Sequence, residues 1–324
     1  MGYNLARRWD RECSMAEIWT MGEMLVEIMR PRVGMPLNEA GEFLGPFPSG
    51  APAIFIDTVS RLGHPAGIIG GVAEDDFGSC LLERLSRDGV DLRFVERVPG
   101  CATAVAFVTY FEDGSRKFIY HIDGTPAAIA RFSEQEPWGE VRFFHVMGCS
   151  LMTNDVFRAE IFKAVEYFHR TGSRISFDPN IRVELLRGRD LKEVIGPVMK
   201  KTAVLLPGEE ELRLLGGDQQ PVKCVERLFE NPHLELIVLK RGKKGASVYS
   251  RSGHIDTPSF SVEEVDPTGA GDCFDAGFLC GMLEGRTLEE CGKMAAAAGA
   301  LNAAAFGPME GNISPESIWE LING

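Results

Sequence analysis

The sequence lacks the marks of several common protein classes. Its eight cysteines form no Cys-x-x-Cys pair, so their spacing indicates neither a disulfide framework nor a zinc site. No apolar run is long enough to span a bilayer, and the first residues do not resemble a secretory signal. We therefore expect a reduced, cytoplasmic protein that does not enter a membrane, in which the cysteines are small buried apolar side chains.

Positive charge is scarce as well. The chain has 34 Lys and Arg against 47 Asp and Glu, which gives a formal net charge of −13 over 324 residues. A protein that binds nucleic acid usually presents a basic face, so we expect no nucleic-acid partner. A small anion such as ATP remains compatible with this balance, because a local site can be positive on an acidic protein.

Several well-known nucleotide-binding and catalytic motifs are missing. There is no Gly-x-x-x-x-Gly-Lys-Ser/Thr loop, which excludes the P-loop kinases, and no Gly-x-Gly-x-x-Gly fingerprint of a dinucleotide-binding fold. His-Glu-x-x-His and Gly-x-Ser-x-Gly are absent too, which speaks against a zinc peptidase and a serine esterase. No group of His, Cys, Asp and Glu has the spacing of metal ligands.

The most informative stretch that is present covers residues 266–278. A polar turn leads to Gly269 and Gly271, and Asp272 follows at the start of an apolar, helix-like run. Glycines at such a junction let the backbone approach a ligand, and the free N–H groups of the first helical turn attract an anion. Asp272 would repel the same anion, so an acid at this position needs a function. One function that fits is to orient and deprotonate a hydroxyl that attacks a phosphate. The alternative is a capped turn without chemistry.

From residue 141 onward, segments with strand and helix patterns alternate. Strands are expected at 141–147, 175–177, 203–206 and 234–239, and helices at 155–170, 191–199, 209–215 and 222–229. Strands separated by helices predict an α/β fold with a doubly wound, mostly parallel sheet flanked by helices. Ligands in such sheets bind at the carboxyl ends of the strands. We also expect a broken first strand over 18–29 and a hairpin of strands at 103–110 and 116–121.

Residues 266–278 resemble, over their whole length, the C-terminal signature of the ribokinase-like (PfkB) family of carbohydrate kinases. That signature reads Asp-x-Thr-Gly-Ala-Gly-Asp, followed by an aromatic residue and Ala-Gly-Phe. The resemblance implies that Asp272 is the catalytic base and meets the substrate. It also implies that the amides of Gly269, Ala270 and Gly271 form an anion hole for the transferred phosphoryl group of ATP.

The same resemblance predicts how the whole chain is organised. It implies a single ribokinase-like kinase domain at 18–324, preceded by an N-terminal extension at 1–17. A small β-sheet lid would be formed by segments within about 30–48 and 100–125. Relatives often pair through their lids, so the resemblance also implies a homodimer through the lid.

Residues 178–182, Asp-Pro-Asn-Ile-Arg, resemble the Asp-x-Asn-x-Arg element of the family, nearest to the fructokinase and 2-keto-3-deoxygluconate kinase branch. The resemblance places Asp178 near the ATP phosphates and the metal, and Arg182 near the substrate. The planar fork of an arginine suits a carboxylate or a phosphate. The alternative is an Asx turn with a surface arginine.

Two further elements resemble the metal and ATP sites of the family. Glu211 stands in a pattern, Asn-x-x-Glu, that organises Mg²⁺ through water, although Gly208 replaces the Asn. A favourable charge at a helix start is the alternative for Glu211. Lys240, Gly242 and Gly245 match a nucleotide-binding Gly-x-x-Gly-Ala turn, in which Lys240 meets phosphate.

The C-terminal part of the chain adds two expectations that rest on the resemblance. Asn302 lies in a helix of small residues and is placed near the adenine of ATP. Asp266, Thr268 and Gly307 resemble residues that hold a monovalent cation in some relatives. The sequence leaves open whether this chain needs K⁺.

The substrate signature of the family is altered near the N-terminus. The resemblance places Gly22, Glu27 and Gly50 in the substrate cleft. Many relatives have Asp at the position of Glu27, Gly at Ser49 and, at Ile54, an Asn that contacts the sugar. These departures predict a different sugar or a shifted one. For Glu27 the alternative is a solvent-facing acid at a strand end.

Together these patterns predict an ATP- and Mg²⁺-dependent kinase that phosphorylates a primary hydroxyl of a sugar or sugar acid, of the fructose or 2-keto-3-deoxygluconate type. Three alternatives stay open. A nucleoside or sugar-phosphate kinase would share the fold, and a non-catalytic sugar or nucleotide sensor would share the binding sites. A structural or interaction protein would leave the glycine loops unexplained. The intact Asp272 and its Gly-Ala-Gly loop count against the sensor.

Overall fold

The computed structural model describes residues 15–324, which form two β-sheets surrounded by helices. The strands of the large sheet are β1 (Ile18–Met21), β4 (Ala66–Ala73), β5 (Asp91–Val98), β8 (Phe143–Met147), β9 (Arg174–Asp178), β10 (Thr202–Leu205), β11 (Leu236–Lys240), β12 (Ala246–Ser250) and β13 (Gly253–Thr257). The strands of the small sheet are β2 (Leu25–Met29), β3 (Leu44–Ser49), β6 (Ala104–Tyr110) and β7 (Arg116–His121). The helices are α1 (Ala51–Arg61), α2 (Asp76–Arg87), α3 (Gly148–Leu151), α4 (Asp155–Arg170), α5 (Val183–Leu186), α6 (Leu191–Met199), α7 (Glu209–Gly216), α8 (Pro221–Leu228), α9 (Ala270–Leu283), α10 (Leu288–Ala303) and α11 (Pro315–Asn323).

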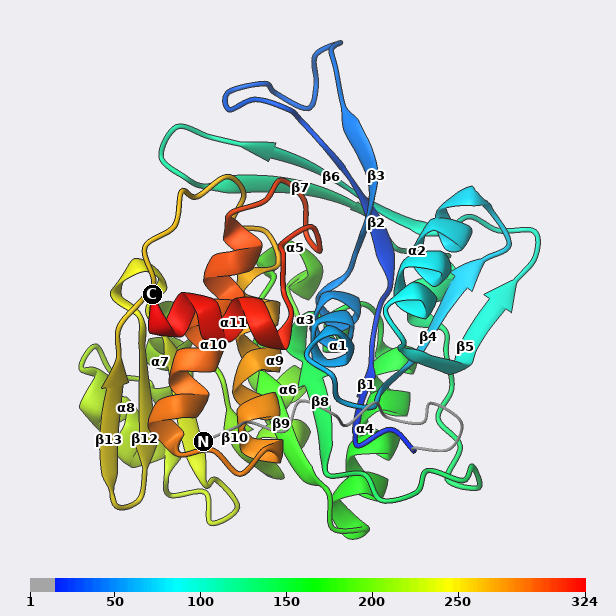
Figure 1. The fold of residues 1–324 in the computed structure, drawn as a ribbon. Coiled ribbons are helices and arrows are strands. Elements are labelled where there is room, and N and C mark those ends of the chain that lie inside the picture. Colours follow the sequence, from blue (N-terminus) through cyan, green and yellow to red (C-terminus); the bar gives the residue numbers. More distant parts are fainter. Residues whose placement is uncertain (1–14) are drawn as a thin grey trace.

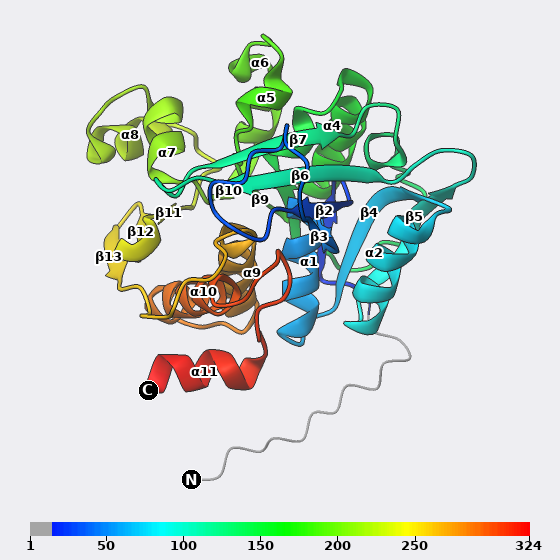
Figure 2. The same ribbon diagram turned by 90° about the horizontal axis from the view of Figure 1, so that it is seen from above.

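The large sheet confirms the predicted doubly wound α/β fold. Its order is β13-β12-β11-β10-β9-β8-β1-β4-β5, and all neighbours from β11 to β5 run parallel. Helices α1, α2, α9 and α10 cover one face, and α4, α6, α7 and α8 cover the other (Figure 2). The chain winds outward in opposite directions from the neighbouring strands β1 and β8. Ligands of doubly wound sheets bind at such a point.

The small sheet lies across the carboxyl ends of the large-sheet strands (Figure 1). Strand β2 pairs antiparallel with β3 and parallel with β6, and β6 and β7 form an antiparallel hairpin. Side chains of β7 alternate between the two faces of the sheet, as strand geometry requires. Arg116, Phe118 and Tyr120 are half-buried toward the large sheet, whereas Lys117 and Ile119 are exposed.

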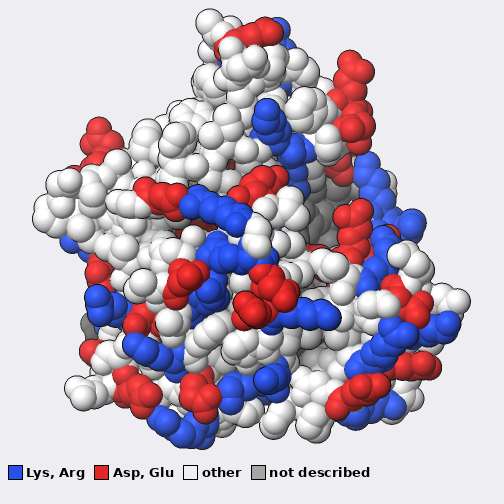
Figure 3. Space-filling model, turned by 180° about the vertical axis from the view of Figure 1, so that it is seen from behind, with Lys and Arg blue, Asp and Glu red and all other residues white. Residues whose placement is uncertain are grey.

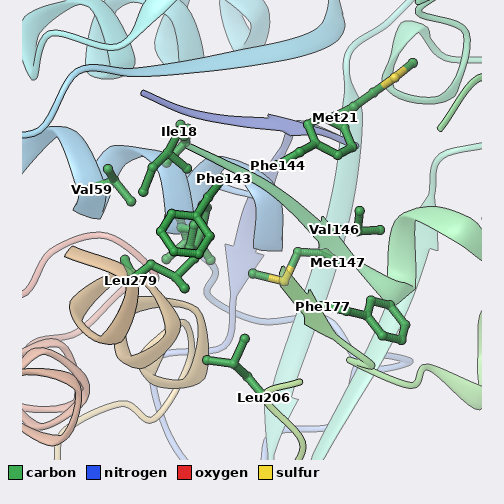
Figure 4. Packing of buried hydrophobic residues seen from close by; sticks show 14 of the residues in the cluster. Ile18, Met21, Val59, Phe143, Phe144, Val146, Met147, Phe177, Leu206 and Leu279 are labelled. Atoms are coloured by element: carbon green, nitrogen blue, oxygen red, sulfur yellow. The ribbon is translucent and has the colours of Figure 1, made fainter. Parts of the chain in front are cut away.

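The hydrophobic core fills both faces of the large sheet. Phe143 on β8 points toward α1 and α9, which carry Val59 and Leu279 (Figure 4). The next residue, Phe144, points to the opposite face, where its ring stacks on Phe168 of α4 with centroids 4.6 Å apart. This alternation of large apolar side chains keeps the central strands rigid, so the strand ends present functional groups at fixed positions.

The structure differs from the sequence-based expectation in its strands. The expected broken strand at 18–29 is two strands in different sheets, because the chain leaves the large sheet at Gly22 and enters the small sheet at Leu25. Strand β2 therefore joins the small sheet, although it lies outside the segments expected for the lid. Strands β5, β12 and β13 were not expected: β5 and β13 are the two edge strands and carry exposed residues, and β12 pairs antiparallel between β11 and β13.

Charges of both signs alternate across the face shown in Figure 3. On this face Lys and Arg side chains lie next to Asp and Glu side chains, in keeping with the modest charged fraction of the chain. Within residues 15–324, no helix has the length and apolar character needed to cross a membrane.

Candidate active site

Two neighbouring cavities open at the carboxyl ends of the large-sheet strands. The first, named the polar cavity, lies between these strand ends and the small sheet. The second, named the apolar cavity, lies between the turn at 240–245, the segment 259–264 and helices α9 and α10. Lys240, Pro267 and Gly271 line both cavities, so the two meet at the start of α9.

Most of the predicted site residues line one or both of these cavities. The polar cavity is lined by Glu27, Gly50, Asp178, Arg182, Glu211, Lys240, Thr268, Gly269, Gly271 and Asp272. The apolar cavity is lined by Lys240, Gly242, Gly245, Ala270 and Gly271. Residues expected near the acceptor and residues expected near ATP thus occupy adjoining spaces.

The two glycines at the start of α9 shape the junction of the cavities. Gly269 is the N-cap of α9 with a left-handed φ of 79°, and a Cβ there would lie 2.3 Å from a backbone carbonyl oxygen. A Cβ on Gly271 would meet only the Lys240 ammonium, at 3.9 Å, so the backbone of Gly271 is open to a ligand. Ala270 differs, because its N–H donates to the carbonyl oxygen of Pro267 at 3.3 Å. The amide of Ala270 is therefore less available to an anion than the prediction implied.

Asp272 faces the polar cavity beside this junction. Its side chain is buried, and Asn180 Nδ2 donates to Asp272 Oδ1 at 3.3 Å. Burial raises the pKa of Asp272 to about 7; the charge of Asp178 adds to this rise, and Lys240 opposes it. A carboxyl group with such a pKa takes up and releases a proton near neutral pH.

Lys240 ends β11 and holds two buried carboxylates. Its Nζ donates to Asp178 Oδ2 at 2.7 Å and to Asp275 Oδ1 at 3.1 Å. Burial alone would lower the pKa of Lys240, but the two carboxylates raise it above its ordinary value. Sequence reasoning missed Asp275. The signal was present, since Asp275 is an acid one helical turn after Asp272 in an otherwise apolar helix.

Glu27 and Ser49, two departures from the family pattern, form a pair in the small sheet. Ser49 Oγ donates to Glu27 Oε1 at 2.6 Å, and among the described residues Glu27 Oε2 is buried without a hydrogen-bond partner. Burial raises the pKa of Glu27 to about 7, while the hydrogen bond from Ser49 lowers it. With 6% of its surface exposed, Glu27 is not the solvent-facing acid of the alternative interpretation. Glu27 thus brings a carboxyl group into the lining of the polar cavity, with one of its oxygens held by Ser49.

Glu23 is a further buried acid of the polar cavity that sequence reasoning missed. It directly follows β1, and its carboxylate accepts hydrogen bonds from Ser150 Oγ at 2.5 Å and Cys149 Sγ at 3.0 Å. Burial raises the pKa of Glu23. Because Cys149 and Ser150 follow β8, these bonds join the ends of β1 and β8 at the point where the sheet changes direction.

Arg182 and Glu211 border the polar cavity from the loops after β9 and β10. No acceptor among residues 15–324 forms a hydrogen bond with the Arg182 side chain, although this arginine faces several acids. Glu211 Oε2 accepts the N–H of Gly208 at 2.8 Å, and its Oε1 accepts the N–H of Ile181 at 2.9 Å. The described residues contain no group of three or more acidic, His or Cys ligands for a metal. Glu211 fits Mg²⁺ only through water, a mode that Mg²⁺ often uses.

Two residues predicted to contact a ligand lie outside both cavities. Asn302 is fully buried, and its Nδ2 donates to the carbonyl oxygen of Thr268 at 2.8 Å, so it does not line the apolar cavity. The face of α10 that does line it carries Ala296, Gly299, Ala300 and Ala303. Gly22 lines neither cavity; a Cβ there would lie 2.2 Å from Pro52, so this glycine serves close packing against α1.

The residues expected to hold a monovalent cation are already engaged by hydrogen-bond donors. Asp266 Oδ1 accepts the Tyr110 hydroxyl at 2.9 Å and the Thr268 N–H at 3.0 Å, and Oδ2 accepts the Gly307 N–H at 3.0 Å. The Thr268 hydroxyl lies 3.2 Å from Tyr110 and 3.1 Å from Arg116 Nη1. Asp266 Oδ1 and the Thr268 hydroxyl thus already have two hydrogen-bond partners each, and a potassium ion on either oxygen would have to displace one of them.

Comparison with known proteins agrees with the sequence motifs. The model of the pfkB family of carbohydrate kinases matches residues 15–315. Fructokinase-1 of Zea mays is 31% identical over 314 residues, which cover 94% of this chain and 96% of the relative. A crystal structure from E. coli assigned as ribokinase II, solved with ATP and Mg²⁺, has a TM-score of 0.89 and 38% identity, covering 95% of this chain and 99% of that one. The chain therefore belongs to the pfkB family of carbohydrate kinases, and it is a sugar kinase.

Proposed function

We propose that this sugar kinase uses ATP and Mg²⁺ to phosphorylate a primary hydroxyl of fructose or a closely similar sugar. One observation carries the proposal: Asp272 and Gly271 lie where the polar and apolar cavities meet. The polar cavity holds the sugar and the apolar cavity holds ATP, so the γ-phosphoryl group reaches the hydroxyl at this junction. The similarity to maize fructokinase-1 supports fructose as the acceptor.

Asp272 is proposed as the catalytic base. The acceptor oxygen forms a bond to the γ-phosphorus, the bond to the bridging oxygen of ADP breaks, and the hydroxyl proton moves to Asp272. The transition state is loose, so the proton leaves late and a carboxylate of modest basicity suffices. The amides at Gly269 and Gly271 stabilise the charge on the phosphoryl oxygens. Glu211 would hold Mg²⁺ through water, and the ion would further neutralise the phosphates.

We assign the remaining site residues to the sugar or to ATP according to the cavity that each of them lines. Glu27 and Gly50 contact the sugar, and Gly242 and Gly245 lie against ATP. Arg182 has no protein acceptor among the described residues, an observation that favours a sugar acid as a second candidate substrate. The ammonium group of Lys240, held by Asp178 and Asp275, contacts the phosphates of ATP.

We further infer that residues 18–324 act as one kinase domain, in which the small sheet is a lid that excludes water during transfer. The strands β3 and β7 present Leu44 and Ile119 to solvent, which supports a homodimer through this sheet. Sedimentation velocity measures the oligomeric state, and a monomer at micromolar concentration would remove the dimer from the proposal.

The first experiment measures ATP consumption with Mg²⁺ over a panel of sugars, sugar acids, sugar phosphates and nucleosides. We expect fructose to be the strongest acceptor. Asp272→Asn should lower turnover by about two to four orders of magnitude, the range for a positioned base, while acceptor binding stays nearly intact. Nucleotide binding without turnover on any acceptor would instead indicate a sensor. Near-normal turnover by Asp272→Asn would remove this residue from the mechanism.

A further inference from the structure

Tyr110 and Arg116 connect the small sheet to the loop that precedes the anion hole. They are the last residue of β6 and the first of β7, and they face each other across the hairpin. The Tyr110 hydroxyl lies 2.9 Å from Asp266 Oδ1 and 3.2 Å from Thr268 Oγ1, and Arg116 Nη1 lies 3.1 Å from Thr268 Oγ1. Thr268 directly precedes Gly269, the N-cap of α9.

Each hydrogen bond in this group has only one possible assignment of donor and acceptor. The Asp266 carboxylate only accepts, and its other partners are backbone N–H groups, so the Tyr110 hydroxyl donates to it. Burial, with the charge of Asp266 adding to it, raises the pKa of Tyr110, which keeps the phenol protonated. The Tyr110 oxygen then accepts the Thr268 hydroxyl, and the Thr268 oxygen accepts the guanidinium of Arg116. This chain of bonds fixes where Arg116 lies.

Arg116 faces the polar cavity with most of its donors uncommitted. Its side chain lines the cavity together with Gly269, Gly271 and Asp272. A guanidinium has five N–H donors, and the protein engages one of them, at Thr268. Arg116 forms no ion pair with an acidic side chain of residues 15–324, and its positive charge lowers the pKa of both Asp272 and Glu27. A charged donor group is thus held beside the catalytic base and the anion hole.

We propose that Arg116 is a further catalytic residue, whose guanidinium contacts the phosphoryl group in transfer, and that Tyr110 positions it through Thr268. The inference rests on the proposed function. During transfer, negative charge spreads over the phosphoryl oxygens, and an arginine brought by the small sheet neutralises part of it. The small sheet then does more than exclude water, because its closure completes the set of groups around the phosphoryl.

The test compares Arg116→Gln with Lys117→Gln, a neighbour on the same strand whose side chain points to solvent. Loss of one transition-state donor costs about 10²- to 10³-fold in kcat, so we expect that loss for Arg116→Gln and a KM for both substrates within a few-fold. Lys117→Gln should match the wild type. Free guanidinium ion should partly restore kcat to Arg116→Ala and leave Lys117→Gln unchanged.

Three further readouts separate the proposal from its competitors. Tight binding of ADP with aluminium fluoride, which mimics the phosphoryl in transfer, should be lost in Arg116→Gln while ADP alone binds normally. Tyr110→Phe should lower kcat less than Arg116→Gln, with Tm changed by a similar amount in both. An increase of KM confined to sugar acids would assign Arg116 to the acceptor carboxylate and overturn the proposal. So would normal kcat of Arg116→Gln, whereas an inactive wild type would refute the proposed function itself.

Discussion

At the scale of single residues, two changes from the family pattern compensate each other. The longer arm of Glu27 reaches a hydroxyl that a glycine at position 49 would not supply. Because Ser49 holds Oε1, the Glu27 carboxylate has a fixed orientation in the lining of the polar cavity. The position where relatives carry an Asn is occupied by Ile54, an apolar wall of the same cavity. Under the proposed function, the sugar would therefore meet an oriented acid here instead of an amide.

The role of Ser49 is testable through the pH dependence of KM. Ser49→Ala removes the hydrogen bond that favours the ionised form of Glu27, so the pKa of Glu27 should rise above its value of about 7. Protonated Glu27 no longer accepts two hydrogen bonds from sugar hydroxyls. We expect KM for the sugar at pH 7 to rise about ten-fold, on the scale of one bond to a charged group, with kcat nearly unchanged.

Raising the pH should restore the affinity of Ser49→Ala, because the carboxylate ionises again, and the acidic limb of the KM profile should move to higher pH. Ser60→Ala is the matched control, since it removes another hydroxyl donor, on α1, outside both cavities. An unchanged pH profile in Ser49→Ala would show that Ser49 does not act through Glu27.

At the scale of elements, helix α9 combines two glycines with different tasks. The backbone at Gly269 has a left-handed φ and lies against Pro308, so a side chain there would disturb the fold. Gly271 is helical and its missing side chain leaves open space at the junction of the cavities. The first glycine shapes the helix start, and the second leaves space at the junction where the proposed function places the phosphoryl group.

Gly271→Val should therefore abolish turnover without unfolding the protein. The new side chain extends toward Lys240 and fills the space where ATP and acceptor meet, so we expect activity below detection and Tm within a few degrees of the wild type. Gly269→Val, the matched variant, should lower Tm markedly, because a Cβ at 2.3 Å from a carbonyl oxygen forces the backbone to shift. Normal ATP turnover by Gly271→Val would refute the anion hole.

Much of this arrangement of elements is readable from the sequence, and the failures have physical causes. Helices such as α4 and α6 match their predicted bounds because their apolar periodicity and caps are local. Strand β2 was predicted as the second part of a broken first strand, since the chain's turn at Gly22 depends on contacts with Pro52 and Ser150 that no local pattern encodes. Residues placed by distant partners, such as Glu23, were missed for the same reason.

The residues of the candidate site also divide into those that a local motif predicts and those that depend on distant contacts. Asp272 and its glycines were predicted because their chemistry lies in one continuous motif. Asn302 was placed near the adenine by the family resemblance, and in the structure its amide donates to a backbone carbonyl that only the folded loop brings near. The Tyr110–Asp266 bond joins residues 156 positions apart and had no signal in the sequence.

At the scale of the whole molecule, hydrogen bonds to Asp266 and Thr268 join the small sheet to the loop that precedes α9. The oxygens used in this junction are the ones expected to hold a monovalent cation. A hydroxyl and a guanidinium of the small sheet occupy them, and the guanidinium brings its own positive charge. Side chains of the small sheet, Tyr110 and Arg116, thus bind the loop where a cation was expected.

Turnover should consequently be independent of K⁺. We expect the same kcat in potassium, sodium and tetramethylammonium chloride at equal ionic strength, because the oxygens of Asp266 and Thr268 already have donors. Tm should also be the same in the three salts. An ion bound specifically to the folded state at 100 times its Kd would stabilise it by about 2.7 kcal/mol, which a melting curve resolves. A higher kcat and a higher Tm in potassium chloride than in the other two salts would contradict this prediction. The ion would then displace Tyr110 and Arg116, and the small sheet would close around a cation instead of directly on the loop that precedes α9.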